Sequence, residues 1–550
     1  MEIFFFYLGF LLLLFSCIGH GLIFFKIFNI QHLENVGTLG LAGLANLAMI
    51  SYISVFLFED KSLVNVLILS IGVIFLIKNY KKLNFPNYFL PIVITISIAL
   101  FISKTHDDFP FYHLQQSLNF SINKIHIGLS NLDFSYAYHS SMLYLNSIFY
   151  LPYFKYYFFN VPNLLVLIFF ILSLIFFVFK NNENKIVKYF GLFTLIFALV
   201  KFSRLSEYGT DLSGQLIIII SLLYLLKSIY EEQTNKDNLK ILTILIIFCI
   251  TLKTYFIFYS LLILICINSL GYKNSFRYIK SNYFFSFYII IYFSLFLALN
   301  IFSSGCLIFP IAKTCFSQLS WSMPINEVIN YNIWFQAWSK SLGGAGYVTE
   351  NYSELINNLD WIGIWYKNYF NKYLETLSLL FFISLILFFT FKPYNFVVKF
   401  SKNQIIIILF LFFVLLFWFL KHPTLRYGGY LLHLSLISMI LSIFLSRSKV
   451  DDFSFRKKAK ILILISISVF LFKNISRIDS EFGKEGDYNF DNFPYFYVKD
   501  VEYKKKNLNN DLVITFANGN ACWASPPPCG SSANLTVESH MNFKIINRKD

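Results

Sequence analysis

Residues 88–103 read YFLPIVITISIALFIS, and residues 104–113, KTHDDFPFYH, follow directly. The first run is apolar and long enough to be a membrane helix, so it places the second at a membrane surface. The adjacent carboxylates Asp107 and Asp108 are costly to keep near a bilayer, which makes them candidates for a function. The alternative is a solvated loop in which the acidic pair caps a short helix.

The composition is that of a membrane protein. Of the 550 residues, 57% are hydrophobic and 14% are charged, and the mean hydropathy is +0.61. A soluble domain carries about 25% charged residues. Apolar runs of about twenty residues recur between short polar links, which predicts an all-α polytopic membrane protein. The net charge of +15 would suggest nucleic acid in a soluble protein, but here its distribution indicates topology and we expect no nucleic-acid partner.

About fourteen transmembrane helices are expected, within a transmembrane domain of residues 1–473. A further apolar stretch, Met142–Phe159, carries Pro152 and Lys155 and is expected to be interfacial or re-entrant. The expected spans are Ile3–Ile27, Val36–Phe58, Ser62–Ile77, Tyr88–Ser103, Pro162–Phe179, Ile186–Lys201, Gly214–Ile229, Leu239–Leu252, Tyr255–Leu270, Tyr283–Phe302, Tyr373–Phe391, Gln404–Leu420, Gly429–Ser446 and Ala459–Phe472.

Lysine and arginine gather in alternate links, which predicts the orientation because cytoplasmic links are enriched in these residues. Counting spans puts all the basic links on one face, expected to be the cytoplasmic face of a bacterial inner membrane. The long loops and the tail then lie on the outer, periplasmic face. The basic links are 78–82, 180–188, 273–280 (with Lys273), 392–402 and 447–460; the outer segments are 104–139, 202–213, 303–372, 421–428 and 474–550.

The cysteines follow the same division. Three lie inside expected spans, and the other four lie on the expected outer face. Outside the cytoplasm two local disulfides are expected, Cys306 with Cys315 and Cys522 with Cys529. The alternative is a metal site built from all four thiolates, although neither pair has the CxxC spacing typical of such sites.

The tail, residues 474–550, is polar and contains short β-prone runs, so a small extracytoplasmic α+β domain is expected there. Its segment CWASPPPC, residues 522–529, is rich in proline, which restricts the backbone. This loop could form a lid or a docking surface, or it could be a structural loop closed by its disulfide.

Charged side chains gather in the outer loops and could together form a polar cavity at the outer leaflet. The alternative is that the basic residues extend along the membrane surface, which suits Lys253 and Lys421. The candidate catalytic residues are Asp107, Asp108, Glu207 and Asp211; the candidate substrate-binding residues are His113, Arg204, Lys253, Lys313, His422, Arg426 and Tyr427.

Such a set suits the transfer of a sugar from a lipid-phosphate donor. A carboxylate can accept the proton of an acceptor hydroxyl, and basic groups can stabilise the phosphate leaving group. Pro110 favours an extended residue before it, so the two carboxylates are expected to point apart. We expect Asp107 to face the cavity as the base, with Asp108 holding the loop or a divalent cation such as Mg²⁺ or Mn²⁺.

Five short motifs span nearly the whole chain: THDDFPFYHLQ (105–115), GLSNLDFSYAYHSS (128–141), SEYGTD (206–211), HPTLRYGG (422–429) and CWASPPPC (522–529). They resemble a family of large bacterial membrane proteins whose function is not characterised. The architecture and the acidic pair also resemble the GT-C superfamily of membrane glycosyltransferases, which includes the protein mannosyltransferases and the aminoarabinose transferases of lipid A.

The GT-C resemblance implies transfer of a hexose or pentose from a polyprenyl-phosphate donor to a glycan, lipid or protein acceptor of the cell envelope. It implies Asp107 or Asp108 as the general base, Glu207 or Asp211 as a second acid, and Arg426 as a contact to the donor phosphate. One departure is that the catalytic acid of the superfamily usually follows the first span, whereas Asp107 follows the fourth. Either three helices have been added at the N-terminus or the correspondence fails.

Two other classes fit parts of the sequence. An O-antigen polymerase or ligase would also have about a dozen spans and basic outer loops, but would depend chiefly on Arg and His. A lipid or glycan transporter should carry charges in mid-span or broken helices in paired halves. Here the charges lie at the outer ends of the spans, and no internal repeat is visible.

Overall fold

We analysed the chain as a computed structural model. The structure describes residues 2–102, 104–207, 209–230, 236–271, 277, 280–341, 352–394, 399–484, 495–508, 512–519, 521–532, 534–540 and 543–548. Lys273 of one basic link and part of the 303–372 loop lie outside these residues, as does Ser103 at the end of the fourth expected span.

Each expected span lies on a helix of the structure. Nine of the described helices are long and apolar enough to cross a membrane by length and composition. The other five, α4, α8, α10, α11 and α19, have 9 to 17 residues, so the number of spans stays a prediction. The helices are α1 (Glu2–Ile27), α2 (Val36–Leu57), α3 (Ser62–Asn79), α4 (Phe89–Ser97), α7 (Val161–Phe179), α8 (Lys185–Lys201), α9 (Asp211–Tyr230), α10 (Lys236–Leu252), α11 (Leu261–Leu270), α13 (Tyr283–Ser304), α17 (Trp361–Phe391), α18 (Lys402–Lys421), α19 (Gly429–Leu445) and α20 (Asp452–Glu481).

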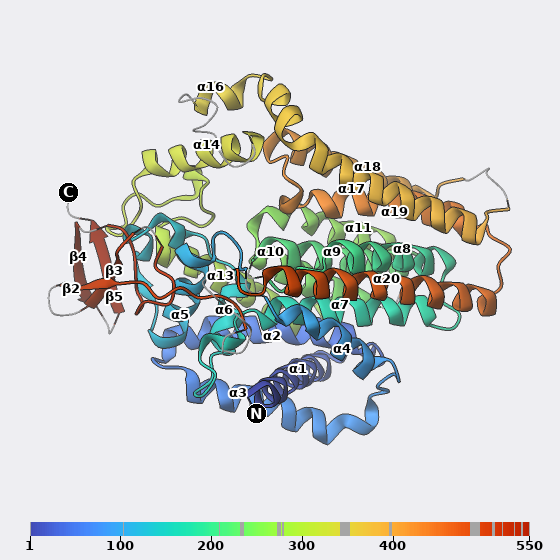
Figure 1. The fold of residues 1–550 in the computed structure, drawn as a ribbon, viewed down its shortest axis with the longest axis horizontal. Helices are drawn as coiled ribbons and strands as arrows, with labels where there is room; N and C mark the ends of the chain where they lie inside the picture. Colours follow the sequence, from blue (N-terminus) through green and yellow to red (C-terminus); the bar gives the residue numbers. More distant parts are fainter. Residues whose placement is uncertain are drawn as a thin grey trace.

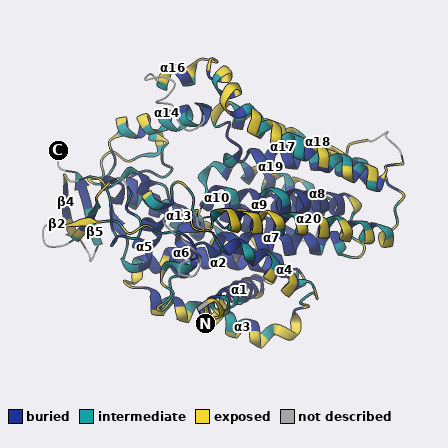
Figure 2. Ribbon diagram, in the orientation of Figure 1, coloured by how far each residue is buried: buried dark blue, intermediate teal, exposed yellow. Residues whose placement is uncertain are grey.

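Burial separates central from peripheral helices (Figure 2). Of the 18 most hydrophobic consecutive residues of the segment Tyr156–Phe179, 94% are buried. The corresponding share in Ser62–Lys82 is 28%. The outer faces of α3 and α18 expose large apolar side chains such as Leu67 and Leu409. Long helices with exposed apolar faces indicate a lipid bilayer environment for the protein.

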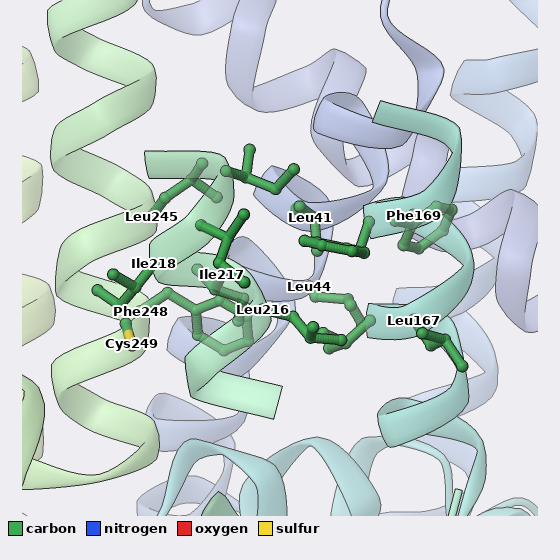
Figure 3. Close-up of a cluster of buried hydrophobic side chains, with 14 of the residues drawn as sticks. Leu41, Leu44, Leu167, Phe169, Leu216, Ile217, Ile218, Leu245, Phe248 and Cys249 are labelled. Atoms are coloured by element: carbon green, nitrogen blue, oxygen red, sulfur yellow. The ribbon is translucent and has the colours of Figure 1, made fainter. Parts of the chain in front are cut away.

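The centre of the bundle is a continuous apolar contact between α2, α7, α9 and α10 (Figure 3). Helix association in lipid depends on van der Waals packing and on small residues that let backbones approach. A Cβ atom added to Gly43 of α2 would lie 1.8 Å from the carbonyl oxygen of Cys17 on α1. The side chains shown include Leu41, Leu44, Leu167, Phe169, Leu216, Ile217, Ile218, Leu245, Phe248 and Cys249.

The two ends of the bundle hold different sets of links (Figure 1). At one end the basic links contact each other: Lys188 Nζ lies 3.0 Å from Asp452 Oδ1, and Lys185 Nζ donates to the Ser448 carbonyl at 3.0 Å. At the other end the Ser130 hydroxyl donates to the Ser303 carbonyl at 2.6 Å, joining the two long loops. The basic links 180–188 and 447–460 therefore lie together, as do the two long loops at Ser130 and Ser303, as expected from their shared faces.

Short elements fill the end that carries the long loops. They are α5 (Leu114–Ile122), α6 (Ser141–Ile148), α14 (Ile325–Ser341) and α16 (Tyr352–Asn357). Helix α6 begins the stretch Met142–Phe159 and is buried: Asn65 Nδ2 donates to the Ser147 carbonyl at 2.7 Å. Helix α6 ends at Ile148 after eight residues, so the stretch does not form a single membrane span.

The tail packs onto the first long loop. Strand β1 (His126–Ile127) from that loop pairs in parallel with β5 (Phe543–Arg548), which pairs antiparallel with β4 (Leu535–His540). Strands β2 (Tyr503–Leu508) and β3 (Leu512–Ala517) form a second, antiparallel pair. The 474–550 segment and the 104–139 loop therefore share one sheet.

Both expected disulfides are present. Cys306 is bonded to Cys315, and Cys522 to Cys529, while Cys17, Cys249 and Cys266 are free and buried. Both bridges lie at the end of the bundle that carries the long loops, away from the basic links. The prediction of two local disulfides is confirmed.

Candidate functional site

A group of charged side chains gathers where three links meet. Asp211 is the first residue of α9, Lys253 follows the last residue of α10, and Arg426 lies on the short turn Leu425–Tyr427 before α19. The Lys253 ammonium lies 2.8 Å from Asp211 Oδ1, and Arg426 Nε lies 3.7 Å from Asp211 Oδ2. Asp211 thus holds two cations that are separated by 173 positions in the sequence.

The first long loop adds a histidine and a carboxylate to this group. Arg426 Nη1 lies 3.3 Å from His106 Nε2, and Asp108 Oδ2 lies 3.6 Å from His106 Nδ1. The backbone amide of Asp108 also donates to His106 Nδ1 at 3.1 Å, and a guanidinium can only donate, so both ring nitrogens of His106 face hydrogen-bond donors. We call His106, Asp108, Asp211, Lys253 and Arg426 the charged cluster.

The two adjacent acids have different surroundings. Asp108 is partly buried and faces His106, whereas Asp107 is exposed. The expectation that Pro110 makes the residue before it extended is wrong, because Phe109 begins the π-helical turn Phe109–His113 and Asp108 has helical φ and ψ. The structure also brings Asp108 and not Asp107 against the other charged residues, the reverse of the expected arrangement.

Aromatic rings flank the cations of the charged cluster. The Arg426 guanidinium lies 4.7 Å from the centre of the Trp338 ring and 4.9 Å from that of Tyr427. Its Nη2 also donates to the Tyr427 hydroxyl at 2.9 Å, and the Lys253 ammonium lies 5.4 Å from the same ring. Cation–π contacts and a hydrogen bond therefore fix the direction of the guanidinium.

Three further polar side chains surround the charged cluster. The ring of His113 lies 5.4 Å from that of His106 and 4.4 Å from that of Tyr112. The pKa of Tyr112 is raised well above its ordinary value by burial and then by the charge of Asp108. The buried hydroxyl of Tyr138 has no hydrogen-bond partner among the described residues, and burial, followed by the neighbouring Tyr112 and Tyr427, raises its pKa.

Burial sets the protonation of the basic groups. It lowers the pKa of His106, and it lowers that of His113 still further, so both rings are neutral near pH 7. Burial also opposes the charge of Lys253, but the Asp211 carboxylate outweighs it and raises the lysine pKa. The charged cluster therefore contains two cations, two acidic residues and one neutral histidine, His106, with the neutral His113 beside it.

His422 lies beside the charged cluster on the link that carries Arg426. Its Nδ1 is 3.1 Å from the Ser339 hydroxyl, and its ring centre is 5.9 Å from that of Tyr427. Burial, followed by the charges of Lys253 and Lys340, lowers the pKa of His422 to about 4.

The structure places three sequence candidates elsewhere. Arg204 and Glu207 form an ion pair with each other, and they contact the end of α20: Arg204 Nη2 lies 3.4 Å from Glu481 Oε1, and Arg477 Nη1 lies 3.7 Å from Glu207 Oε1. Lys313 is exposed on the turn between Cys306 and Cys315 and makes no ion pair with a described residue. Among the contacts of the described residues, none joins these three side chains to the charged cluster.

Sequence reasoning missed His106, Trp338, Tyr112 and Tyr138 as parts of the site. His106 and Tyr112 belong to the same short stretch as Asp108, and their proximity in sequence was a usable signal. Trp338 lies on α14, within a loop where nothing in the sequence distinguishes it from other aromatic residues. Only the folding of α14 against the Arg426 link reveals its role.

A metal site is not apparent in the described part of the chain, where no group of three or more His, Cys, Asp or Glu side chains could hold an ion. Among the described residues, the metal-binding side chain that contacts Asp108 is His106. The divalent cation expected from the sequence stays a prediction.

The disulfide-closed loop of the tail supports the segment that carries Asp108. The amide of Trp523 donates to the Pro110 carbonyl at 2.9 Å. The Gln115 side-chain amide donates to the Trp523 carbonyl at 3.0 Å and to the Ser525 carbonyl at 2.5 Å. These bonds fasten both sides of residues 110–115 to the tail.

Comparison with known proteins identifies a family. A family model described as a domain of unknown function, DUF8201, matches residues 3–433. The chain belongs to this family. No curated protein and no solved structure matches it.

The DUF8201 region contains the whole charged cluster. It begins before His106 and ends after Arg426, and it includes four of the five motifs. The fifth motif, CWASPPPC, lies beyond the matched region and acts on the site from outside through Pro110 and Gln115.

Proposed function

We propose that the protein is a membrane glycosyltransferase that moves a sugar from a polyprenyl-phosphate donor to a cell-envelope acceptor. The observation that carries this proposal is the charged cluster, in which a carboxylate, Asp108, and two cations, Arg426 and Lys253, lie within one network at a bundle end. Proton acceptance and phosphate stabilisation are the two tasks that such a transfer requires.

The reaction that we assign to these groups is a single displacement. The acceptor hydroxyl oxygen attacks the anomeric carbon while the bond from that carbon to the phosphate oxygen breaks, and the electron pair leaves with the phosphate. Arg426 and Lys253 stabilise the phosphate charge, with Asp211 fixing their positions. Asp108 accepts the hydroxyl proton, and His106, which contacts Arg426 and accepts a hydrogen bond from the Asp108 amide, holds the backbone of Asp108 in place.

The aromatic side chains suit a sugar. Trp338 and Tyr427 present ring faces beside the guanidinium, and Tyr138 offers a buried hydroxyl for a hydrogen bond. Sites for small molecules combine aromatic walls with a few fixed polar groups in this way. The apolar helices would accept the polyprenyl chain.

In this proposal Asp108 replaces Asp107 as the base. The reason is contact: Asp108 faces His106 inside the network, while Asp107 is exposed. The finer parts of the topology belong to the proposal as well, namely fourteen spans, a bacterial inner membrane and a site on the periplasmic face. The separation of basic links from disulfides supports that orientation, because disulfides persist in oxidising compartments.

A polymerase or ligase of O-antigen type is the second candidate. The contact between Arg426 and His106 and the position of His422 favour it, since such enzymes depend on Arg and His. The two candidates differ in their need for a carboxylate base.

The test is transfer by washed membranes from polyprenyl-phosphate sugars, with hexoses and pentoses tried separately. Loss of a general base costs ~10²–10⁴-fold in rate, so Asp108→Asn should reduce transfer by that factor while Asp107→Asn stays within threefold. Glu59→Gln, which changes an exposed acid of the α2–α3 link, is the matched control. Arg426→Gln should weaken binding of polyprenyl phosphate to the purified protein.

If Asp108→Asn and Arg426→Gln both transfer at the wild-type rate, the glycosyltransferase proposal fails. If Arg426→Gln abolishes transfer while Asp108→Asn does not, the polymerase or ligase candidate is favoured.

A further inference from the structure

A second polar site lies at the opposite end of the bundle, among the basic links. A cavity of about 320 Å³ opens there between the starts of α8 and α18 and the end of α19. Three cations line it: Lys185, Lys399 and Arg447. No Asp or Glu is among the residues that form its wall.

Two of these cations have no acidic partner among the described residues. Lys399 and Arg447 are exposed and form no ion pair with a described residue. Lys185 is held in place by bonds to the Ser448 and Val450 carbonyls, at 3.0 and 3.4 Å, which leaves its charge uncompensated. The cavity therefore has a strong positive potential.

The nearby acids are already engaged: Glu183 Oε1 accepts from the Asn184 amide at 3.2 Å, and Asp451 Oδ2 caps α20 by accepting from the Ser454 amide at 3.2 Å. Asp452 lies 3.0 Å from Lys188 and 3.8 Å from Arg456, both outside the cavity wall. Its charge is therefore shared between two other cations and does not balance Lys399 or Arg447.

The helix ends add to this potential. Asn184 and Gln404 both line the cavity. Asn184 caps α8 by accepting a hydrogen bond from the Ile186 amide, and Gln404 belongs to the capping box of α18. Two helix N-termini, which carry partial positive charge, thus meet at the cavity together with three basic side chains.

The surroundings show which kind of anion fits. Immediately after the cavity, α18 exposes a row of apolar side chains, including Ile405 (46% exposed) and Leu409 (61% exposed). A phosphate seated in the cavity would have these side chains beside it, at acyl-chain depth. We propose that this cavity binds the phosphate group of an anionic phospholipid, with the acyl chains lying along α18.

This proposal is independent of the glycosyltransferase proposal, since it concerns the other end of the bundle. It commits to a membrane lipid as the source of the phosphate. Basic pockets between membrane helices on the cytoplasmic side are suited to such headgroups, and each Lys or Arg near the surface contributes roughly 1 kcal/mol of attraction.

The experiment is a titration of the full chain, purified in detergent, with phosphatidylglycerol, followed by native mass spectrometry. Lys399→Gln combined with Arg447→Gln should weaken binding about 30-fold, which is about 2 kcal/mol at 1.4 kcal/mol per factor of ten. The matched control is Lys457→Gln combined with Lys460→Gln, which removes the same charge from exposed residues of α20 outside the cavity. The control should stay within threefold of wild type.

Further arms distinguish the sources of the phosphate. Phosphatidylcholine should bind both double variants as it binds wild type, which also reports that they are folded. Inorganic phosphate, added at an ionic strength matched with chloride, should not displace phosphatidylglycerol. Equal weakening in the two double variants, no weakening in either, or displacement by inorganic phosphate would each overturn the proposal.

Discussion

Asp211 is the residue whose removal should disturb the charged cluster most. The change Asp211→Asn keeps the size of the side chain but leaves two cations without their partner, Lys253 at 2.8 Å and Arg426 at 3.7 Å. At an effective dielectric constant of 20 these distances correspond to gross attractions of about 6 and 4.5 kcal/mol. Most of this is offset by the cost of taking the ions out of water.

The net effect is smaller and can be bounded. Breaking a fully buried ion pair by removing one partner costs ~3–5 kcal/mol. The side chains of Lys253 and Arg426 are 32% and 31% exposed, so water screens part of the unbalanced charge. We therefore expect Asp211→Asn to lower the free energy of unfolding by ~2–3 kcal/mol.

The assay is denaturant unfolding in detergent, arranged as a double-mutant cycle with Arg426→Gln. Because the second change removes one unbalanced cation, the double variant should be more stable than the sum of the two losses implies, with a coupling of ~1–2 kcal/mol. Asp107→Asn makes the same chemical change at an exposed carboxylate and should cost under ~0.5 kcal/mol. A coupling indistinguishable from zero, or equal losses from Asp211→Asn and Asp107→Asn, would refute the structure of the network.

Three further predictions concern pH, the tail and topology. His422 has a folded-state pKa of about 4, below its ordinary value of 6.5, so the unfolded chain binds the proton more readily. The free energy of unfolding should therefore fall as the pH drops from about 6.5 to about 4. His422→Gln should flatten that part of a plot of unfolding free energy against pH. Replacing Cys522 and Cys529 by Ser should remove about 2.5 kcal/mol of constraint from a short loop and raise hydrogen exchange in residues 110–122, whereas unchanged exchange would mean that the tail does not support this segment. A single Cys introduced at Ser322 should react with an impermeant reagent from outside, and one at Lys457 should not; equal labelling would contradict the orientation.

Much of the fold could be predicted from the sequence because a bilayer imposes simple rules. Every expected apolar span coincides with a helix, and the basic links 180–188 and 447–460 contact each other as their shared lysines and arginines indicated. The disulfides followed from the same division. The number of helices that cross the membrane is harder to predict. Helices α8 and α10 have 17 residues each and are buried by neighbouring helices, so their length alone does not show whether they cross.

The site was predicted in part. Asp108, Asp211, Lys253 and Arg426 lie in four segments far apart in the sequence, and their shared position at short helix links was the signal that grouped them. The same reasoning also included Arg204 and Glu207, which are only a few positions before Asp211 but bind the end of α20 instead. Whether a charged residue in such a link faces one neighbour or another depends on helix packing, and the sequence pattern does not contain that information.

The choice between Asp107 and Asp108 illustrates what the tertiary contacts add. The backbone argument from Pro110 was wrong, because Phe109 is helical and not extended, and it could not say which carboxylate meets the rest of the protein. That is decided by residues on either side: the Pro110 carbonyl is held by the Trp523 amide of the tail, and His106 is held by Arg426. With both flanks fixed, Asp108 contacts the His106 ring and Asp107 is exposed. A segment outside the family-matched region thus holds one flank of the acidic pair, so in the proposed mechanism the tail is a positioning element for the site and not only a closed loop.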